Sequence, residues 1–98
     1  MKSLGTLWEF IVGEATVAEV VKSIASVPHP IDGANFIPSV GLWRSKLEAC
    51  VRVEIAGLNA SVAEMVAEQL RRDFGQQAVF VARNGEAWLR EDENEVSI

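Results

Sequence analysis

The sequence predicts an α+β domain in which two β-α-β units share one antiparallel sheet, and three observations support this prediction. Runs of β-forming residues alternate along the chain with two segments of helical period. The stretch Glu14–Val21 recurs as Asn59–Val66, at a constant offset of 45 residues. The strands that precede the two stretches align at the same offset, Phe10 with Ile55. A β-α-β unit repeated once is the ferredoxin-like fold, βαββαβ, with two helices on one face of the sheet.

The first unit begins with a strand over residues 7–12, which are rich in β-forming side chains. A helix follows over residues 16–27, where Thr16 and Glu19 form a capping box and Pro28 ends the helix. The apolar residues of this segment recur at the spacing of one helical face. They are Val17, Val20, Val21 and Ile24.

The second unit opens on an irregular strand and a regular one. Pro38 and Gly41 interrupt the strand over residues 36–43, so we expect it at an edge of the sheet. Residues 44–48 form a hairpin connection to a strand over residues 49–55, in which apolar and polar side chains alternate. One face of this third strand is therefore expected in the core, and the other carries Cys50, Arg52 and Glu54.

The second helix is predicted to begin at Ser61, with Glu64 completing a capping box, and Gly75 is placed for its C-terminal cap. Its apolar stripe consists of Val62, Met65, Val66, Leu70 and Phe74.

The chain ends in a predicted hairpin that adds an extra strand to the ferredoxin-like sheet. Asn84-Gly85 is a strong signal for a two-residue turn between strands 78–82 and 86–90. This turn pairs Val81 with Trp88 on one face and Phe80 with Leu89 on the other.

Charge is concentrated at the C-terminus. The net charge of −5 owes most to Glu91, Asp92, Glu93 and Glu95. We therefore expect one domain over residues 1–90 and an acidic tail over residues 91–98, which we interpret as a solvated terminus rather than a DNA mimic or a docking segment. Because Lys and Arg form no cluster, we expect no nucleic-acid partner.

The compartment is expected to be the cytoplasm. No stretch approaches the ~18–20 apolar residues of a membrane helix, and no secretory signal is recognisable, so we expect no membrane association. The single Cys50 allows no disulfide within the chain.

Large apolar side chains fall on both faces of the first strand and of the last hairpin. Two helices cover only one face, so either Trp8 and Phe10 or Leu7 and Ile11 must point away from them. Because a monomer rarely exposes such a patch, we expect a homo-oligomer, with a foreign protein partner as a further possibility. The candidate interface residues are Trp8, Phe10, Trp43, Arg52, Glu54, Phe80 and Leu89.

The middle of the chain resembles the CutA family, small trimeric proteins related in shape to the PII signalling proteins. Asn35-Phe36-Ile37-Pro38 matches the family's Asn-x-x-Pro segment, and residues 43–48 match its Trp-x-Gly-Lys-Ile-Glu hairpin, with Ser45 in place of Gly. The family's His-Pro-Tyr-Glu stretch after the second helix is missing. The resemblance implies a trimer, favoured over a dimer, with a ligand cleft between subunits.

The residues offer little for catalysis or metal binding. Cys50 and His29 lie far apart in sequence, and no nucleophile elbow or phosphate loop is present. We therefore predict no catalytic residues, no metal ligands and no cofactor. A site shared across a trimer axis is left open, since three copies would triple one ligand.

The candidate ligand-binding residues are Trp43, Arg44 and Lys46, which combine an aromatic ring with two cations on one hairpin. The alternative is that Trp43 packs against a neighbouring subunit and the cations are solvated. We accordingly predict a non-catalytic binding or regulatory module, such as an accessory protein of a phage or mobile element. The alternative is a PII-like or CutA-like trimeric sensor of a small anion or metal ion, and a small enzyme of the dimeric α+β barrel type finds least support.

Overall fold

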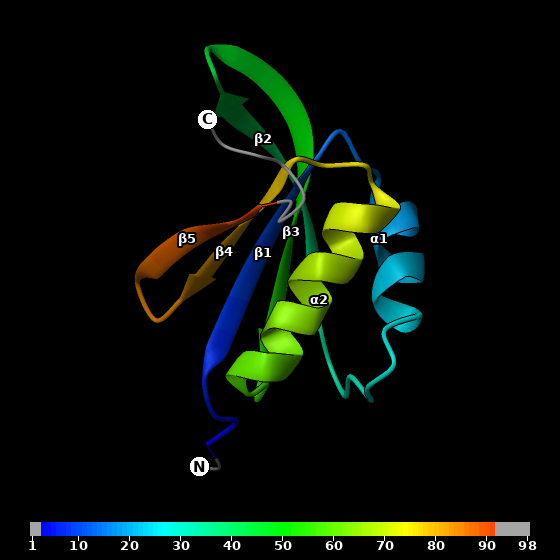
Figure 1. Ribbon diagram of the computed structural model, residues 1–98, viewed down its shortest axis with the longest axis vertical. Helices are drawn as coiled ribbons and strands as arrows, with labels where there is room; N and C mark the ends of the chain where they lie inside the picture. The colour runs from blue at the N-terminus through cyan, green and yellow to red at the C-terminus, as the bar shows by residue number, and fades with distance from the viewer. Residues whose placement is uncertain (1–2, 92–98) are drawn as a thin grey trace.

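A computed structural model describes residues 3–91, which form a five-stranded antiparallel sheet and two helices (Figure 1). Both helices lie on one face of the sheet, and the opposite face is bare. Within the described residues, no helix is long and apolar enough to cross a membrane. The predicted acidic tail lies outside the described residues from Asp92 onward. The elements are β1 (Leu7–Gly13), α1 (Val17–Ala25), β2 (Asn35–Trp43), β3 (Lys46–Ala56), α2 (Ala60–Asp73), β4 (Ala78–Arg83) and β5 (Glu86–Glu91).

The strand order β2-β3-β1-β4-β5 confirms the ferredoxin-like prediction, with β5 added beside β4. The interrupted strand β2 lies at an edge of the sheet, as predicted, with β3 on one side and no strand among the described residues on the other. At an edge the missing N–H of Pro38 is tolerated. The predicted β4–β5 register is also observed, with Val81 opposite Trp88 and Phe80 opposite Leu89. The two turn residues, Asn84 and Gly85, both have positive φ angles, as a two-residue hairpin of this type requires.

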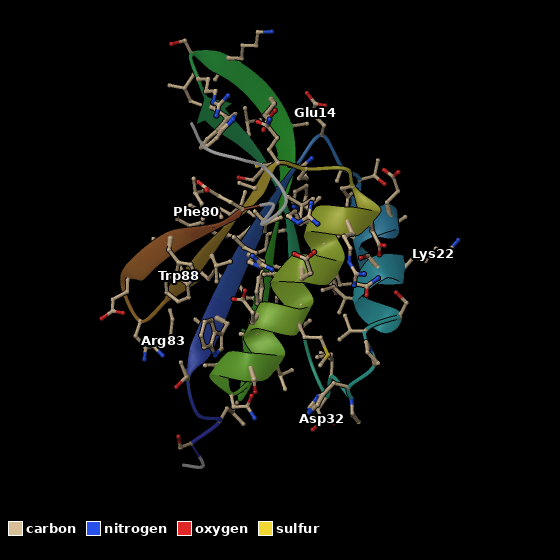
Figure 2. The ribbon with its side chains drawn as sticks, in the orientation of Figure 1. Glu14, Lys22, Asp32, Phe80, Arg83 and Trp88 are labelled. Carbon is tan, nitrogen blue, oxygen red and sulfur yellow. The ribbon has the colours of Figure 1, made fainter. Side chains whose placement is uncertain are left out.

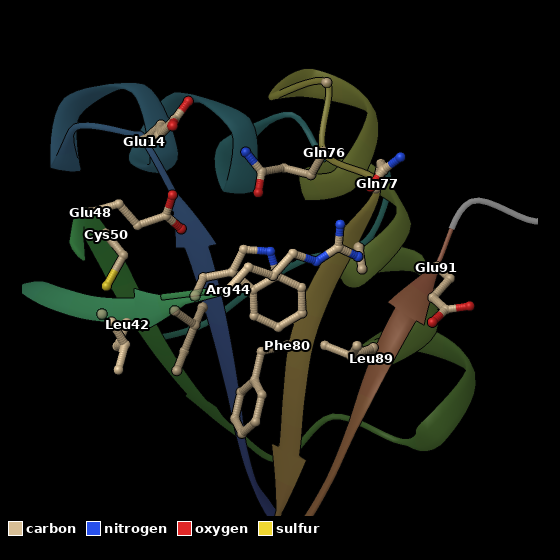
Figure 3. A pocket seen from close by; sticks show the side chains of 15 residues that line it. Glu14, Leu42, Arg44, Glu48, Cys50, Gln76, Gln77, Phe80, Leu89 and Glu91 are labelled. Carbon is tan, nitrogen blue, oxygen red and sulfur yellow. The ribbon is translucent and has the colours of Figure 1, made fainter. Parts of the chain in front are cut away.

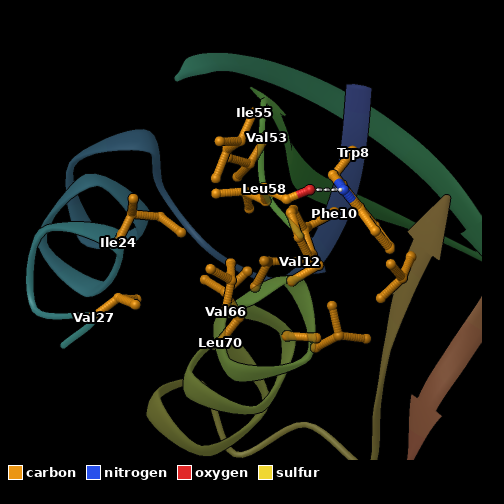
Figure 4. Close-up of a cluster of buried hydrophobic side chains, with 14 of the residues drawn as sticks. Trp8, Phe10, Val12, Ile24, Val27, Val53, Ile55, Leu58, Val66 and Leu70 are labelled. Atoms are coloured by element: carbon orange, nitrogen blue, oxygen red, sulfur yellow. Dashed lines mark hydrogen bonds between the residues drawn. The ribbon is translucent and has the colours of Figure 1, made fainter. Parts of the chain in front are cut away.

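The core lies between the sheet and the helices (Figure 4). On β1 it takes Trp8, Phe10 and Val12, and the Trp8 indole Nε1 donates to the Leu58 carbonyl at 2.9 Å. The assignment of Trp8 and Phe10 to an oligomer interface is therefore corrected. Side chains alternate along a strand, and β1 directs the even-numbered set toward the helices, which leaves Leu7 and Ile11 on the open face.

The helix starts differ in how far they follow the sequence prediction. Thr16 caps α1 through the predicted capping box with Glu19. In α2 the predicted cap at Ser61 is wrong, because the Asn59 side chain accepts the Val62 N–H at 2.9 Å and the cap therefore lies two residues earlier than expected. Asn and Ser are both good caps, and here the Ser61 hydroxyl donates to the Asn59 side chain instead.

The end of α2 is a Schellman motif, which matters for the site described below. Gly75 takes the left-handed conformation at φ +58°, as predicted for the C-terminal cap. The Gly75 N–H donates to the Arg72 carbonyl and the Gln76 N–H to the Arg71 carbonyl, at 3.2 and 2.9 Å. The motif fixes the backbone of Gln76 against the last turn of the helix.

Polar contacts join α2 to its neighbours on both sides. The buried Ser23 hydroxyl of α1 donates to the Asp73 carboxylate of α2 at 2.6 Å, and this bond lowers the pKa of Asp73, as does a second one from Gln69. On the other side of α2, Arg90 of β5 forms ion pairs with Glu64 at 2.6 Å and Glu68 at 3.1 Å. The added strand is thus anchored to the helix as well as to the sheet.

The hairpin β4–β5 carries aromatic and cationic side chains near the first strand (Figure 2). The rings of Trp8 and Trp88 meet edge to face with centroids 5.7 Å apart, and the Arg83 guanidinium lies 5.4 Å from the Trp8 ring. Trp88 lies opposite Val81 on the helical side and stays partly exposed at the margin of the core.

Candidate functional site

A cavity of about 890 Å³ opens at one end of the bare sheet face (Figure 3). Its volume falls within the range of roughly 300–1,000 Å³ that is typical of small-molecule sites. Five parts of the chain supply its walls: the end of β1, the β2–β3 hairpin, the α2–β4 connection, β4 and β5. The lining residues are Ile11, Glu14, Gly41, Leu42, Trp43, Arg44, Glu48, Cys50, Gly75, Gln76, Gln77, Ala78, Phe80, Leu89 and Glu91.

Apolar side chains from three neighbouring strands form one wall of the cavity. Ile11 of β1 is opposite Phe80 of β4, and Phe80 is opposite Leu89 of β5, so the three side chains lie in a row across the sheet. Phe80 and Leu89 keep more than a third of their surface exposed. Phe80 and Leu89 were predicted at an oligomer interface, and their place in this wall also makes them available to an apolar ligand.

Glu48 of β3 brings a carboxylate into the cavity. The structure places its Oε1 directly against the Cα of the buried Gly13, where a Cβ would overlap it. Glu48 is half-buried, and within residues 3–91 it makes no hydrogen bond or ion pair. Its carboxylate is therefore available to a cation that enters the cavity.

The turn beneath Glu48 is held from two directions. Glu14, at φ +53°, turns the chain away from β1 while its N–H donates to the Ala49 carbonyl at 2.8 Å. The Gln76 side chain crosses from the α2–β4 connection and donates to the Gly13 carbonyl at 3.1 Å. Three chain segments far apart in sequence thus meet at Gly13.

The β2–β3 hairpin supplies the aromatic and cationic part of the site. Arg44 and Ser45 occupy its turn with positive φ angles, and the Arg44 guanidinium lies 5.4 Å from the centre of the Trp43 ring. Trp43 and Arg44, two of the three predicted ligand-binding residues, line the cavity, and their part in binding stays a prediction. Lys46 does not line it, because it pairs with Trp43 one residue beyond the turn and remains exposed.

The other chemically notable residues are divided between two places. Cys50 lines the main cavity, whereas His29 lines a separate apolar cavity of about 450 Å³ beside α1. The structure therefore does not bring a Cys–His pair together. Among the described residues, no three His, Cys, Asp or Glu side chains lie close enough to hold a metal ion.

The residues that sequence reasoning missed are Glu48, Gln76 and Glu14. Glu48 stands on the same strand face as Cys50, Arg52 and Glu54, so the alternation already placed it on the open side. Gln76 carried no such signal, because its role depends on the distant Gly13. The carboxylates of Glu14, Glu48 and Glu91 surround the cavity with one lining cation, Arg44, among the described residues, which favours a cationic or zwitterionic ligand.

Comparisons with known proteins find similarity in structure alone. No family model matches the chain, and no curated protein matches it. A phage SAM lyase in complex with S-methyl-5′-thioadenosine is similar at a TM-score of 0.79 and 19% identity, covering 98% of this chain and 96% of that one. A phage SAM lyase in its apo state is similar at 0.77 and 22% identity, with 98% of both chains covered. At these identities the likeness establishes the fold.

This likeness corrects the functional prediction. The expectation of a non-catalytic module is contradicted, because the fold is shared over nearly the whole length with an enzyme. The alternative of a PII-like sensor is set aside with it, since the similar structures are lyases. The resemblance to the CutA family remains an expectation that rests on the motifs of residues 35–48.

Proposed function

We propose that the chain is an enzyme that binds S-adenosylmethionine (SAM) in the cavity and cleaves it to S-methyl-5′-thioadenosine. The observation that carries the proposal is the Glu48 carboxylate, which has no partner among residues 3–91 and is set in a cavity with an apolar wall. SAM carries a sulfonium cation between an adenosine and a zwitterionic amino acid, and this charge pattern matches an acidic cavity with aromatic side chains. The similar phage lyases support the same reading.

The reaction that fits a lyase needs no reactant besides SAM. The substrate's own carboxylate attacks its γ-carbon, a C–O bond forms, and the C–S bond breaks with its electron pair passing to sulfur. The products are the neutral thioether and a lactone that keeps the ammonium group. Atoms and charge balance without transfer of a proton, so the step requires neither a general base nor an enzymic nucleophile.

The cavity's own residues would bind and orient the substrate for this step. All four residues line the cavity. In the proposed complex Glu48 would face the sulfonium, Arg44 would pair with the amino-acid carboxylate, and Trp43 and Phe80 would offer flat faces to the adenine. The step neutralises a positive sulfur and a negative oxygen together. Because a step that loses charge is favoured in an environment less polar than water, the apolar wall of Ile11, Phe80 and Leu89 would accelerate the reaction.

The test is to incubate the purified chain with SAM and to quantify methylthioadenosine by chromatography and mass spectrometry, against a protein-free sample that corrects for spontaneous decay. Water labelled with ¹⁸O separates lyase from hydrolase chemistry. Direct hydrolysis places the label on the γ-oxygen of homoserine, whereas lactone formation leaves that oxygen unlabelled. Methylthioadenosine formation no faster than in the protein-free sample would rule out the proposed activity.

We also propose that copies of the chain cover the open sheet face, with a trimer favoured over a dimer by the resemblance to CutA. Arg52 lies in the middle of this face, and its Nε is buried without a hydrogen-bond partner among the described residues. Glu9 of β1 lies opposite Glu54 of β3, at the next position along the same face from Arg52. Among residues 3–91, neither carboxylate forms an ion pair with Arg52. A second copy would supply the missing carboxylate, which keeps Arg52 and Glu54 as interface candidates.

A further inference from the structure

We propose that Gln76 is a positioning residue that sets where the Glu48 carboxylate stands in the cavity. The inference rests on the proposed function and names a residue that would act on the substrate through another side chain. It follows from the meeting of Gln76, Gly13 and Glu48, which come from three different segments of the chain.

The backbone of Gln76 is anchored on its own side. Its N–H closes the Schellman motif at the end of α2, and its carbonyl accepts from Arg71 Nη1 at 3.4 Å. Arg71 is in turn held by Glu68, with contacts of 2.7 and 3.0 Å that lower the pKa of that carboxyl. Gln76 therefore reaches toward the sheet from a rigid helix end.

The side chain of Gln76 transmits this anchoring to the end of β1. Its Nε2 donates to the Gly13 carbonyl at 3.1 Å, and Gly13 is buried at the last rung of the β1–β3 ladder, opposite Cys50. This hydrogen bond restrains the peptide of Gly13 at the end of β1. Because the Glu48 carboxylate lies against Gly13, where a Cβ would overlap it, the position of that peptide also sets the position of the carboxylate.

The substitution Gln76→Met removes the amide donor without changing charge or side-chain length greatly. The matched control is Gln69→Met, which removes the side-chain hydrogen bonds from Nε2 to Asp73 at 2.8 Å and to Ser26 at 3.4 Å on the far side of α2. A merely structural role of Gln76 would make the two variants alike in their effect on Glu48, since each loses side-chain hydrogen bonds that hold α2 or its end in place.

The first measurement uses the free protein and no substrate. The carboxyl ¹³C resonance of Glu48 and the amide resonance of Gly13 are followed in the wild type and in both variants. We expect both resonances to move in Gln76→Met and to stay in place in Gln69→Met. A Glu48 resonance that stays in place in Gln76→Met overturns the inference, whether or not the protein binds SAM.

The second measurement compares the KM for SAM, from initial rates of cleavage, with the dissociation constant of neutral methylthioadenosine. Both are measured for Gln76→Met in the wild-type background and in the background of Glu48→Gln. We expect Gln76→Met to weaken SAM binding about fivefold, the effect of one hydrogen bond, and methylthioadenosine binding less than twofold. In the Glu48→Gln background the effect on SAM should vanish. Equal weakening of both ligands, or an effect that persists without the Glu48 charge, overturns the inference. A wild type that binds neither ligand overturns the proposed function, and the resonances then decide the positioning on their own.

Discussion

Replacing Glu48 with Gln separates charge recognition from every other contribution of the cavity. The substitution keeps the size of the side chain, and Glu48 has no ion pair among residues 3–91 that would be lost. Two unit charges about 5 Å apart attract by roughly 3 kcal/mol at an effective dielectric constant of about 20. Because Glu48 is only half-buried, water halves this value to about 1.5 kcal/mol, which corresponds to about a tenfold change in affinity.

The assay measures initial rates of methylthioadenosine formation by the wild type and by Glu48→Gln, which give the KM for SAM, and calorimetric titration with methylthioadenosine, which is not cleaved. We expect SAM to bind about tenfold more weakly to the variant, while methylthioadenosine, which has no sulfonium charge, binds almost as before. Glu86→Gln is the control, since it removes the same charge from the exposed β4–β5 turn, away from the cavity. If both ligands lose affinity equally, or if SAM loses none, Glu48 does not recognise the sulfonium and the reasoning is refuted.

The remaining predictions concern the cavity, the open face and the helical layer. Gly13→Ala adds a Cβ that overlaps the Glu48 carboxylate, so we expect a loss of SAM affinity like that of Glu48→Gln. The melting temperature should stay close to that of the wild type, because only the end of a flexible side chain must move. An unchanged SAM affinity would contradict the placement of Glu48. Arg52→Glu places a carboxylate beside Glu9 and Glu54 on the open face, and we expect the native mass by light scattering to fall to that of a single chain. A wild type that is already monomeric would end the oligomer proposal. The Ser23 hydroxyl lowers the pKa of Asp73, so the contribution of Asp73 to the free energy of unfolding is present above the ordinary pKa of 3.8 and is lost as the pH falls through the lower folded value. Asp73→Asn should therefore flatten the acid part of a plot of the free energy of unfolding against pH. Parallel plots for the wild type and the variant would show that the Ser23 hydrogen bond contributes nothing.

The fold was predictable because its signals are local. The capping box at Thr16, the alternation along β3 and the Asn84-Gly85 turn each involve residues a few positions apart, and each was found where it was expected. The start of α2 was missed because Asn59 and Ser61 are both competent caps. The choice between them depends on how far β3 continues before the chain turns, which the local pattern does not contain.

The site was only partly predictable, because its geometry depends on contacts between distant segments. Trp43 and Arg44 stood out by their chemistry on a hairpin. Gln76 and Gly13 are 63 residues apart, and neither residue type signals that the two would meet. The proposed lyase activity was not predicted from the sequence, for a chemical reason. In the proposed reaction the substrate supplies both the nucleophile and the leaving group, so the sequence would carry no marked nucleophile or general base.

The anchoring of β5 by Arg90 has a consequence for how the cavity responds to ionic strength. The strand contributes Leu89 and Glu91 to the wall, and its tie to α2 runs through Arg90, whose side chain is only 15% exposed. Mobile ions screen such a partly buried contact far less than an exposed pair such as Arg83–Glu86. Added salt should therefore weaken attraction of a cation toward the cavity mouth while leaving the wall in place, so that the rate of ligand capture depends on salt more steeply than the rate of release.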